Sequence, residues 1–288
     1  MAKETVFCSQ KTLNCKGKII NLSSPLVMGV MNITPDSFYD GGWYRHPLDA
    51  ISLTEKMLTE GADIIDVGAA SSRPGANIID PRDEQERLMP ALKAIRKQFP
   101  QAIISVDTYH SGTARKAVEA GASMINDISS GSIDPEMFAT IAEVKVPYVI
   151  MHMQGTPADM QKEPAYRDVV KEVAAFFSKR VSQLKQMGVH DIIIDPGFGF
   201  GKTLSHNYVL LQHLDFFSIF GLPVLAGVSR KSMINKLLGT TPGQALNGTT
   251  VLHTLALERG ANILRVHDVK EAVEAIKIFS YLKKHQEL

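Results

Sequence analysis

Short apolar segments rich in β-branched residues recur along the chain, and most of them end in a carboxylate or an amide. The clearest is Ile192–Ile194, which runs into Asp195 and then breaks at Pro196-Gly197. Proline removes a backbone donor and glycine frees the backbone, so a strand is predicted to stop at Asp195. Each such segment is therefore expected to deliver a polar side chain to the edge of a sheet, next to a loop.

The hydrophobic pattern predicts eight strands, each followed by a helix. The strands are expected at residues 25–30, 63–67, 102–106, 123–125, 147–151, 192–195, 223–226 and 261–264. The helices are expected at residues 48–60, 83–98, 113–120, 135–143, 168–187, 207–217, 243–259 and 269–284. Eight βα units without a linker or a composition break fit a (β/α)8 TIM barrel better than an open doubly wound sheet. We expect one α/β domain over residues 1–288, with its core at about 17–282 and a short strand or hairpin at residues 17–22.

Composition and charge narrow the classes of function. Apolar residues make up 44% and charged residues 21% of the chain, as in ordinary globular proteins, and the formal net charge is +1. A net charge this close to zero gives no reason to expect a nucleic-acid or membrane-surface partner. We expect neither a signal peptide nor a membrane span, because no apolar run approaches the ~20 residues that cross a bilayer. The two cysteines, Cys8 and Cys15, are expected to be free thiols in the cytoplasm.

The glycine-rich stretch Gly197–Thr203 suggests a phosphate-binding loop, but its spacing excludes one. The pattern G-x-x-x-x-G-K-T would require glycine at position 196, and the chain has Pro196 there. We therefore interpret these glycines as residues that allow tight turns and the close approach of a ligand.

Four carboxylates follow predicted strands: Asp66, Asp107, Asp127 and Asp195. A single aspartate at a strand end is commonly a helix cap, but four at one edge, with Asn126 among them, favour a ligand site. Together with Lys231, these groups suit a flat heterocycle that offers N–H donors beside a carbonyl. The same edge lacks the His-rich spacing of a tight transition-metal site.

A second group of polar residues favours an anion. Arg73 and Arg265 follow different strands but are expected at the same edge, with Ser72 before the first and His267 after the second. Two arginines and a histidine suit phosphate or diphosphate, although each arginine taken singly is equally compatible with a solvated surface position. The amide oxygen of Asn32, after the first strand, can hold Mg²⁺ together with such an anion.

Two residues have alternative interpretations. Lys231 has no apolar cage next to it in the sequence, which favours a hydrogen-bond donor over a Schiff-base nucleophile. His152, after the fifth strand, is compatible with a catalytic base and with a packed or capping histidine, and the packed position is the commoner of the two. A serine hydrolase is not indicated, because no serine lies in a nucleophile-elbow motif.

Taken together, these segments resemble the dihydropteroate synthase family over about residues 17–282. In chain order, the matching segments are MGVMNITPDSFYDGG, SSRPGA, SVDT, INDISSG, VIMHMQGTP, IIDPGFGFGKT, GVSRKSMI and GTTVLHTLALERGANILRVHDV. Eight segments in order, each at a predicted strand end, are far more specific than any single motif. The chain differs from the family pattern at Ala69-Ala70, where Gly-Glu is usual.

The resemblance implies a transferase of folate biosynthesis. It would condense 6-hydroxymethyl-7,8-dihydropterin diphosphate with p-aminobenzoate to 7,8-dihydropteroate and diphosphate, by a dissociative displacement. The implied pterin contacts are Asp107, Asn126, Ile128, Met151, Asp195, Lys231 and Arg265. The implied diphosphate contacts are Ser72, Arg73, Arg265 and His267, with Mg²⁺ as cofactor near Asn32. The implied p-aminobenzoate contacts are Phe38, Pro74, Phe200 and Ser229, and the implied catalytic residues are Asp107, Lys231, Arg265 and His267.

Two other functions remain open. A pterin methyltransferase acting on methyltetrahydrofolate would share the acidic and amide edge, but it has no need of Arg73 and Arg265 for a diphosphate. A non-catalytic paralogue would bind pterin or diphosphate without turnover, a possibility that Ala69-Ala70 leaves open. Family members also suggest a homodimer, with the helices before and after the eighth strand as its interface.

Overall fold

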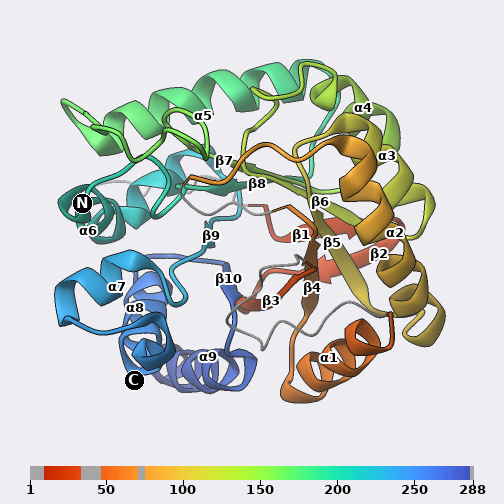
Figure 1. Cartoon of the computed structure of the whole chain (residues 1–288). Helices are drawn as coiled ribbons and strands as arrows, with labels where there is room; N and C mark the ends of the chain where they lie inside the picture. Colours follow the sequence, from red (N-terminus) through yellow and green to blue (C-terminus); the bar gives the residue numbers. More distant parts are fainter. Residues whose placement is uncertain (1–9, 34–46, 71–74, 286–288) are drawn as a thin grey trace.

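Eight parallel strands form one curved sheet in the computed structural model, which describes residues 10–33, 47–70 and 75–285 (Figure 1). The strands are β3 (Leu26–Asn32), β4 (Ile64–Gly68), β5 (Ile103–Asp107), β6 (Met124–Asp127), β7 (Tyr148–Met151), β8 (Ile192–Asp195), β9 (Leu225–Ala226) and β10 (Ile263–Val266). Their order in the sheet is β8-β7-β6-β5-β4-β3-β10-β9, so neighbours in sequence are almost all neighbours in space.

The sheet closes on itself through a single contact between its edge strands. Ile194 of β8 forms an isolated parallel bridge with Val224, and its N–H donates to the carbonyl of Pro223 over 2.9 Å. The closure is weak because β9 has only two residues. The predicted (β/α)8 barrel is confirmed, in a nearly closed form.

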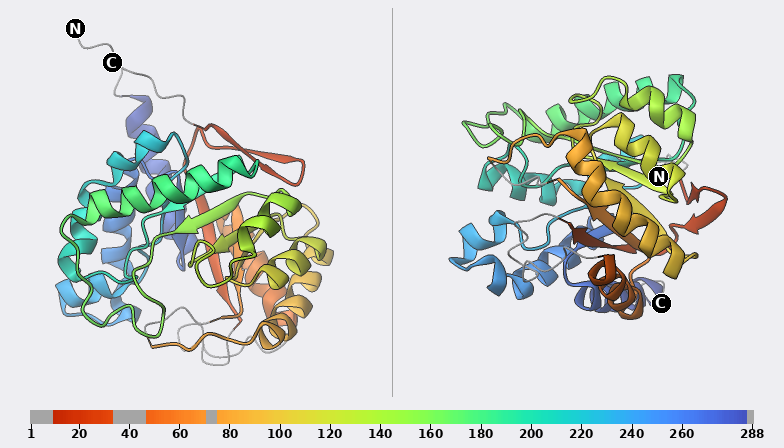
Figure 2. Two further views of the ribbon diagram at one scale, coloured as in Figure 1. Left: turned by 90° about the horizontal axis from the view of Figure 1, so that it is seen from above. Right: turned by 45° about the vertical axis from the view of Figure 1, so that its right-hand side comes forward.

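Helices surround the barrel and connect its strands (Figures 1 and 2). They are α1 (Pro47–Glu60), α2 (Pro81–Gln98), α3 (Ser111–Glu119), α4 (Met137–Val144), α5 (Val169–Gln186), α6 (Leu204–Gln212), α7 (Ser232–Leu238), α8 (Leu246–Glu258) and α9 (Val269–Lys284), with the 3₁₀ helices η1 (Leu214–Phe220) and η2 (Pro242–Gln244). None of the helices in the described ranges combines the length and hydropathy needed to cross a membrane.

The helix boundaries predicted from the sequence differ most from the observed ones in the last third of the chain. The pattern predicts one helix after the seventh strand, from residue 243, but the structure has α7 and η2 ahead of α8. Gly239 ends α7 in the left-handed conformation, with φ at 66°, so the amphipathic pattern is interrupted there. Likewise, α6 begins at Leu204 rather than at residue 207, because Thr203 and His206 form a capping box.

Alternation along the strands separates the core into two parts. The side chains on the outer face of the strands point toward the helices and form the large apolar cluster between the sheet and the helices. The other set faces the barrel interior, where Ile64, Ile103, Met124, Val149, Ile193, Leu225 and Ile263 fill the lower part. Such a filled interior makes the barrel a packed core rather than a pore.

An antiparallel hairpin closes the N-terminal end of the barrel. It consists of β1 (Thr12–Cys15) and β2 (Lys18–Asn21), and it lies opposite the loops that follow the strands (Figure 2). Leu13, Cys15, Ile20 and Leu22 are buried in the same cluster as the interior strand residues. The short N-terminal strand or hairpin expected near residues 17–22 is therefore a hairpin that begins earlier, at Thr12.

Truncating the hairpin's buried side chain should destabilise the barrel. Leu13 is fully buried, so Leu13→Ala is expected to cost about 2–5 kcal/mol of unfolding free energy through lost burial and a residual cavity. Urea unfolding measures this cost. Ile19→Ala in the same hairpin is the control, because Ile19 is 59% exposed and its truncation should change stability by only about 0.5 kcal/mol or less. Equal costs for the two variants would contradict a sealing role for the hairpin.

Candidate active site

A layer of polar side chains lies above the apolar filling of the barrel, at the C-terminal ends of the strands. It contains Asp66 of β4, Asp107 of β5, Asn126 of β6, Asp195 of β8 and Arg265 of β10. Strand register sets this level, because Asp107 pairs with Asn126 and Met151 with Asp195. Five inward-facing polar groups from five strands therefore converge at one mouth, as the strand-end pattern predicts.

Arg265 holds this layer together. Its Nε donates to Asp66 Oδ2 and its Nη2 donates to Asp107 Oδ2, each over 2.7 Å. Asn126 Nδ2 donates to the same Asp66 oxygen over 3.1 Å, which leaves the amide oxygen of Asn126 to accept from a ligand. Asp66 thus links a basic and an amide side chain, a role that the sequence does not assign to it.

Burial and charge pairing act in opposite directions on these groups. Burial raises the pKa of Asp107 to about 7, although Arg265 opposes the rise. Burial alone would lower the pKa of Arg265, but Asp66 and Asp107 more than offset it, so its pKa lies above the ordinary value. Arg265 is therefore a permanent cation beside a carboxyl group whose proton is exchangeable near neutral pH.

Asp195 and Lys231 are neighbouring charged groups at the mouth, each within the electrostatic influence of the other. Asp195 Oδ1 accepts the N–H of Gly197 over 2.8 Å. A Cβ placed on Gly227 would lie 3.7 Å from both Asp195 Oδ2 and Lys231 Nζ, so glycine leaves open the space next to both groups. Burial raises the pKa of Asp195 and lowers that of Lys231 to about 8, and each charge partly counteracts the shift of the other.

His267 is a neutral hydrogen-bonding group in this structure. The backbone N–H of His267 donates to Ser229 Oγ over 3.1 Å, and the same oxygen lies 3.0 Å from Nδ1 of the His267 ring. Burial, reinforced by Arg265, lowers the pKa of His267 to about 4. Donation from Ser229 Oγ to Nδ1 would place the ring proton on Nε2.

An apolar wall completes the described mouth. Ile128, Met151 and Phe200 belong to one buried cluster with Tyr109 and Met160. The first three are among the predicted substrate contacts, whereas Tyr109 and Met160 are not. Tyr109 follows the end of β5 by two residues, which is a usable signal, but nothing in the sequence pattern marks Met160.

The alternatives left open by the sequence are resolved for three residues. The prediction that Asp127 belongs to the ligand site is wrong, because it points away from the mouth and holds its own loop, accepting from Ser129 N, Gly131 N and Tyr148 Oη. His152 is a packed histidine, because it is buried, its ring centroid lies 5.0 Å from that of Phe176 and Lys202 lies 3.0 Å from its Nδ1. This burial lowers its pKa to about 3. Lys202, from the glycine-rich stretch, is itself buried and donates to backbone carbonyls rather than facing a phosphate.

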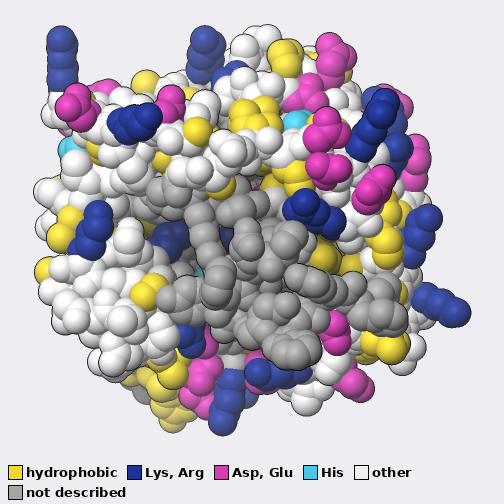
Figure 3. Space-filling view, in the orientation of Figure 1, with side chains coloured by type: hydrophobic (Ala, Val, Ile, Leu, Met, Phe, Trp, Pro, Cys, Tyr) yellow, Lys and Arg dark blue, Asp and Glu magenta, His cyan; other side chains and the backbone are white. Residues whose placement is uncertain are grey.

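Some predicted contacts lie outside the described residues, namely Phe38, Ser72, Arg73 and Pro74. Asn32 ends β3 beside Gly68 and is half-buried. On the face shown in Figure 3, acidic and basic side chains are mixed around the periphery.

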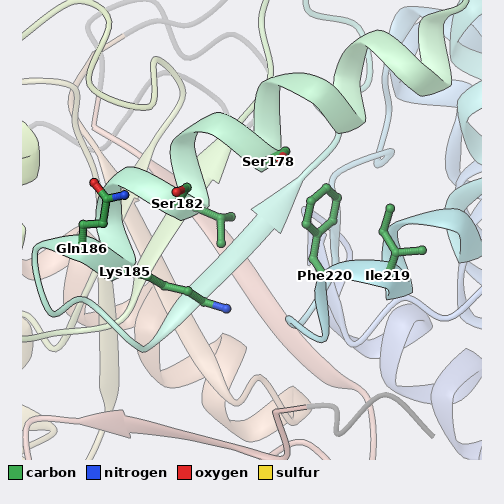
Figure 4. A pocket seen from close by; sticks show the side chains of 7 residues that line it. Ser178, Ser182, Lys185, Gln186, Ile219 and Phe220 are labelled. Carbon is green, nitrogen blue, oxygen red and sulfur yellow. The ribbon is translucent and has the colours of Figure 1, made fainter. Parts of the chain in front are cut away.

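A separate groove lies between the C-terminal half of α5 and η1 (Figure 4), at the N-terminal end of β8 and so away from the mouth.

Comparison with known proteins places this site in a family. The family model for pterin-binding enzymes matches residues 28–267, which include every described residue of the mouth. The dihydropteroate synthase of Escherichia coli strain K12 is 45% identical over 268 residues, which cover 92% of this chain and 94% of that protein. The chain belongs to the dihydropteroate synthase family. The predicted family and its transferase class are thereby confirmed.

Solved dihydropteroate synthases share the fold closely. The Yersinia pestis enzyme, in a complex with a sulfonamide drug, has a TM-score of 0.91 and 40% identity over 95% of this chain and 99% of its own. The Xanthomonas albilineans enzyme with 4-aminobenzoic acid has a TM-score of 0.88 and 40% identity over 96% of this chain and 99% of its own.

The proximity of Arg265 to His267 can be tested by titration. In Arg265→Met, the His267 pKa should rise from about 4, because a neighbouring cation is lost and two carboxylates lose their partner. NMR of the imidazole signals measures the shift. Arg259→Met is the control, since Arg259 is exposed at the end of α8 and should leave His267 unchanged. An unaltered His267 titration in Arg265→Met would contradict the electrostatic arrangement described above.

Proposed function

We propose that this protein is a dihydropteroate synthase that condenses 6-hydroxymethyl-7,8-dihydropterin diphosphate with p-aminobenzoate. The products are 7,8-dihydropteroate and diphosphate, in folate biosynthesis. The observation that supports it best is the convergence of Asp107, Asn126, Asp195, Lys231 and Arg265 at one barrel mouth. This set offers both acceptors and donors to a flat bicyclic ring.

The pterin ring is proposed to lie on the polar layer. Its amino and ring N–H groups would donate to Asp195 and to the amide oxygen of Asn126, while Lys231 would donate to its carbonyl. Arg265 would pack on the ring, with Ile128 and Met151 as apolar walls. Both apolar residues are buried in the cluster beside the mouth, which supports this arrangement.

The diphosphate is proposed to lie toward Arg265 and His267, with Ser72 and Arg73 as further contacts. His267, which burial keeps neutral by lowering its pKa to about 4, would donate one ring N–H to the diphosphate. We also propose Mg²⁺ near Asn32. The amide oxygen of Asn32 is a hard ligand of the kind that Mg²⁺ accepts, and Mg²⁺ commonly takes its other ligands from phosphate and water. When bound, it would neutralise diphosphate charge.

The p-aminobenzoate is proposed to lie between Phe200 and Ser229, with Phe38 and Pro74 as further contacts. Phe200 faces the mouth within the apolar cluster, and its ring centroid lies 4.6 Å from Lys231 Nζ. Lys231 therefore lies where both substrates would meet. This position suits a residue that aligns the amine with the pterin methylene carbon.

We propose a dissociative displacement. An arylamine is a weak nucleophile, so departure of diphosphate with the electrons of the C–O bond would precede C–N bond formation. Arg265 and His267 would stabilise the leaving charge, and Asp107, ionised, would stabilise the positive methylene carbon. The amine nitrogen then bonds to that carbon and loses a proton. Asp107, Lys231, Arg265 and His267 are thus the proposed catalytic residues.

A direct assay tests the proposed function. Purified protein with the pterin diphosphate, p-aminobenzoate and Mg²⁺ should release dihydropteroate and diphosphate in equal amounts. Pterin binding without product would favour a non-catalytic paralogue, and methyl transfer from methyltetrahydrofolate would favour the methyltransferase.

Asp195→Asn should weaken pterin binding by about 1–3 kcal/mol in calorimetry, because a charge-assisted hydrogen bond is lost.

We also propose that one domain covers the chain, that the protein is cytoplasmic, and that it forms a homodimer. Every strand from β3 to β10 joins one sheet, which supports the first point. Cys15 is a buried free thiol, which suits a reducing compartment. The exposed apolar residues Val251 and Leu255 of α8, beside exposed residues of α7 and α9, support a dimer interface (Figure 1).

Charge placed on α8 should separate the proposed dimer. The double variant Val251→Asp/Leu255→Asp should sediment as a monomer in analytical ultracentrifugation, because two carboxylates would be buried in an apolar interface. Ile219→Asp, at a similarly exposed position on η1, should leave the dimer intact. A monomeric parent protein at micromolar concentration would refute the dimer.

A further inference from the structure

Lys202 is a buried lysine for which the proposed reaction has no role. It follows the last glycine of the stretch Gly197–Gly201, and only 3% of its surface is exposed. A lysine is almost never this buried unless its ammonium group is fully paired. Lys202 lies behind the loop that borders the mouth, so the groups it binds show what holds that loop in place.

The Lys202 ammonium group joins the loops that follow two neighbouring strands. On the loop after β8, Nζ donates to the carbonyls of Gly197 over 2.9 Å and of Phe200 over 3.0 Å. On the loop after β7, it lies 3.2 Å from the carbonyl and 3.0 Å from Nδ1 of His152. An ammonium group has three N–H donors, so four acceptors leave none of them for a ligand.

The two loops are in direct backbone contact around this lysine. A Cβ on Gly197 would overlap the carbonyl oxygen of His152, and a Cβ on Gly201 would approach that of Gln154 within 2.5 Å. Both glycines also have positive φ, so only glycine fits at either position. The carbonyls of His152 and Phe200 accept from the buried Lys202, and without it they would carry a desolvation cost, whereas Gly197 O also accepts the Phe200 N–H.

The outer side of the same loop faces the proposed p-aminobenzoate site. The carbonyl of Phe198, between the two that bind Lys202, accepts from Lys231 Nζ. The ring of Phe200 lies under that same ammonium group. Two lysines thus donate to carbonyls of this short loop: Lys202, buried behind it, to those of Gly197 and Phe200, and Lys231, at the mouth, to that of Phe198.

We propose that Lys202 is a positioning residue that fixes the Phe200 ring and the Lys231 amine for the arylamine substrate, by tying the Gly197–Gly201 loop to His152. The proposal rests on the proposed function for the identity of that substrate. It gives the glycine-rich stretch, whose spacing excludes a phosphate-binding loop, a role in positioning a substrate.

Burial and the charge of Asp195 act in opposite directions on the pKa of Lys202. Burial lowers the pKa of Lys202 to about 7, with Asp195 opposing the shift and Lys231 adding to it. Burial likewise keeps His152 neutral, so its Nδ1 is free to accept a hydrogen bond.

Lys202→Met tests the proposal, with Arg96→Met as its matched control. Arg96 also donates to loop carbonyls, those of Pro100 and Gly121, but at the opposite end of the barrel. In steady-state kinetics, Lys202→Met should raise the KM for p-aminobenzoate about tenfold or more, with less than about a threefold change in pterin dissociation constant. Arg96→Met should lower the melting temperature without raising either KM.

A double-mutant cycle with Phe200→Ala separates positioning from general destabilisation. If Lys202 acts through the Phe200 ring, the two substitutions together should raise the KM hardly more than Phe200→Ala alone. Independent, multiplicative effects would overturn the proposal, as would a KM for p-aminobenzoate within twofold of the parent. Should Lys202→Met not fold, Lys202→Gln retains two N–H donors and serves in its place.

Amide hydrogen exchange without substrates keeps the test separate from the assay. The Phe200 N–H donates to Gly197 O over 3.1 Å and the Gly199 N–H donates to Asn207 Oδ1 over 2.6 Å. Both amides should exchange at least about tenfold faster in Lys202→Met than in the parent protein. In Arg96→Met their exchange rates should equal those of the parent. Unchanged exchange in Lys202→Met would refute the loop-fixing role even if the parent made no dihydropteroate, whereas an inactive parent with faster exchange would refute only the substrate assignment.

Discussion

The shared ion pairs of Arg265 are the interaction on which the barrel mouth depends. Charged groups inside a barrel are costly unless each has a partner. Arg265 meets this condition by bonding Asp66 and Asp107, which come from two other strands, and Asp66 in turn accepts from Asn126. Removing the arginine would leave two buried carboxylates uncompensated. The orientation of the amide and acidic groups is therefore fixed before any ligand binds, which reduces the ordering cost of binding.

The polar layer is stable because the rest of the interior excludes water from below it. Apolar residues fill the barrel beneath Asp66, and the N-terminal hairpin seals that filling with Leu13 and Ile20. The same burial shifts the pKa values of Asp107 and Lys231 toward neutrality, to about 7 and about 8. Both groups can then exchange protons near physiological pH.

Local patterns in the sequence predict the strands and the polar strand ends well, because alternation and breakers act over a few residues. The last helix, Val269–Lys284, has the predicted bounds. Three of the four acids expected at the mouth, Asp66, Asp107 and Asp195, lie there, and Asp127 does not. Long-range pairing is different. Arg265 bonds Asp66 across 199 positions of sequence, and no local pattern encodes that contact. The helix Ser232–Leu238 is also missed, because its seven residues are too short for a clear helical period.

The charge of the mouth argues for a further cation in the proposed reaction. Among the described residues of the mouth, three carboxylates, Asp66, Asp107 and Asp195, face two cations, Lys231 and Arg265, so their formal sum is −1 when all five are charged. The neutral His267 adds a donor but no charge, and Lys202 already binds carbonyls behind the loop. Such a cluster suits an uncharged pterin ring and gives no net attraction to a diphosphate. Productive binding would therefore require positive charge from beyond this cluster, which is the role proposed for Arg73 and Mg²⁺.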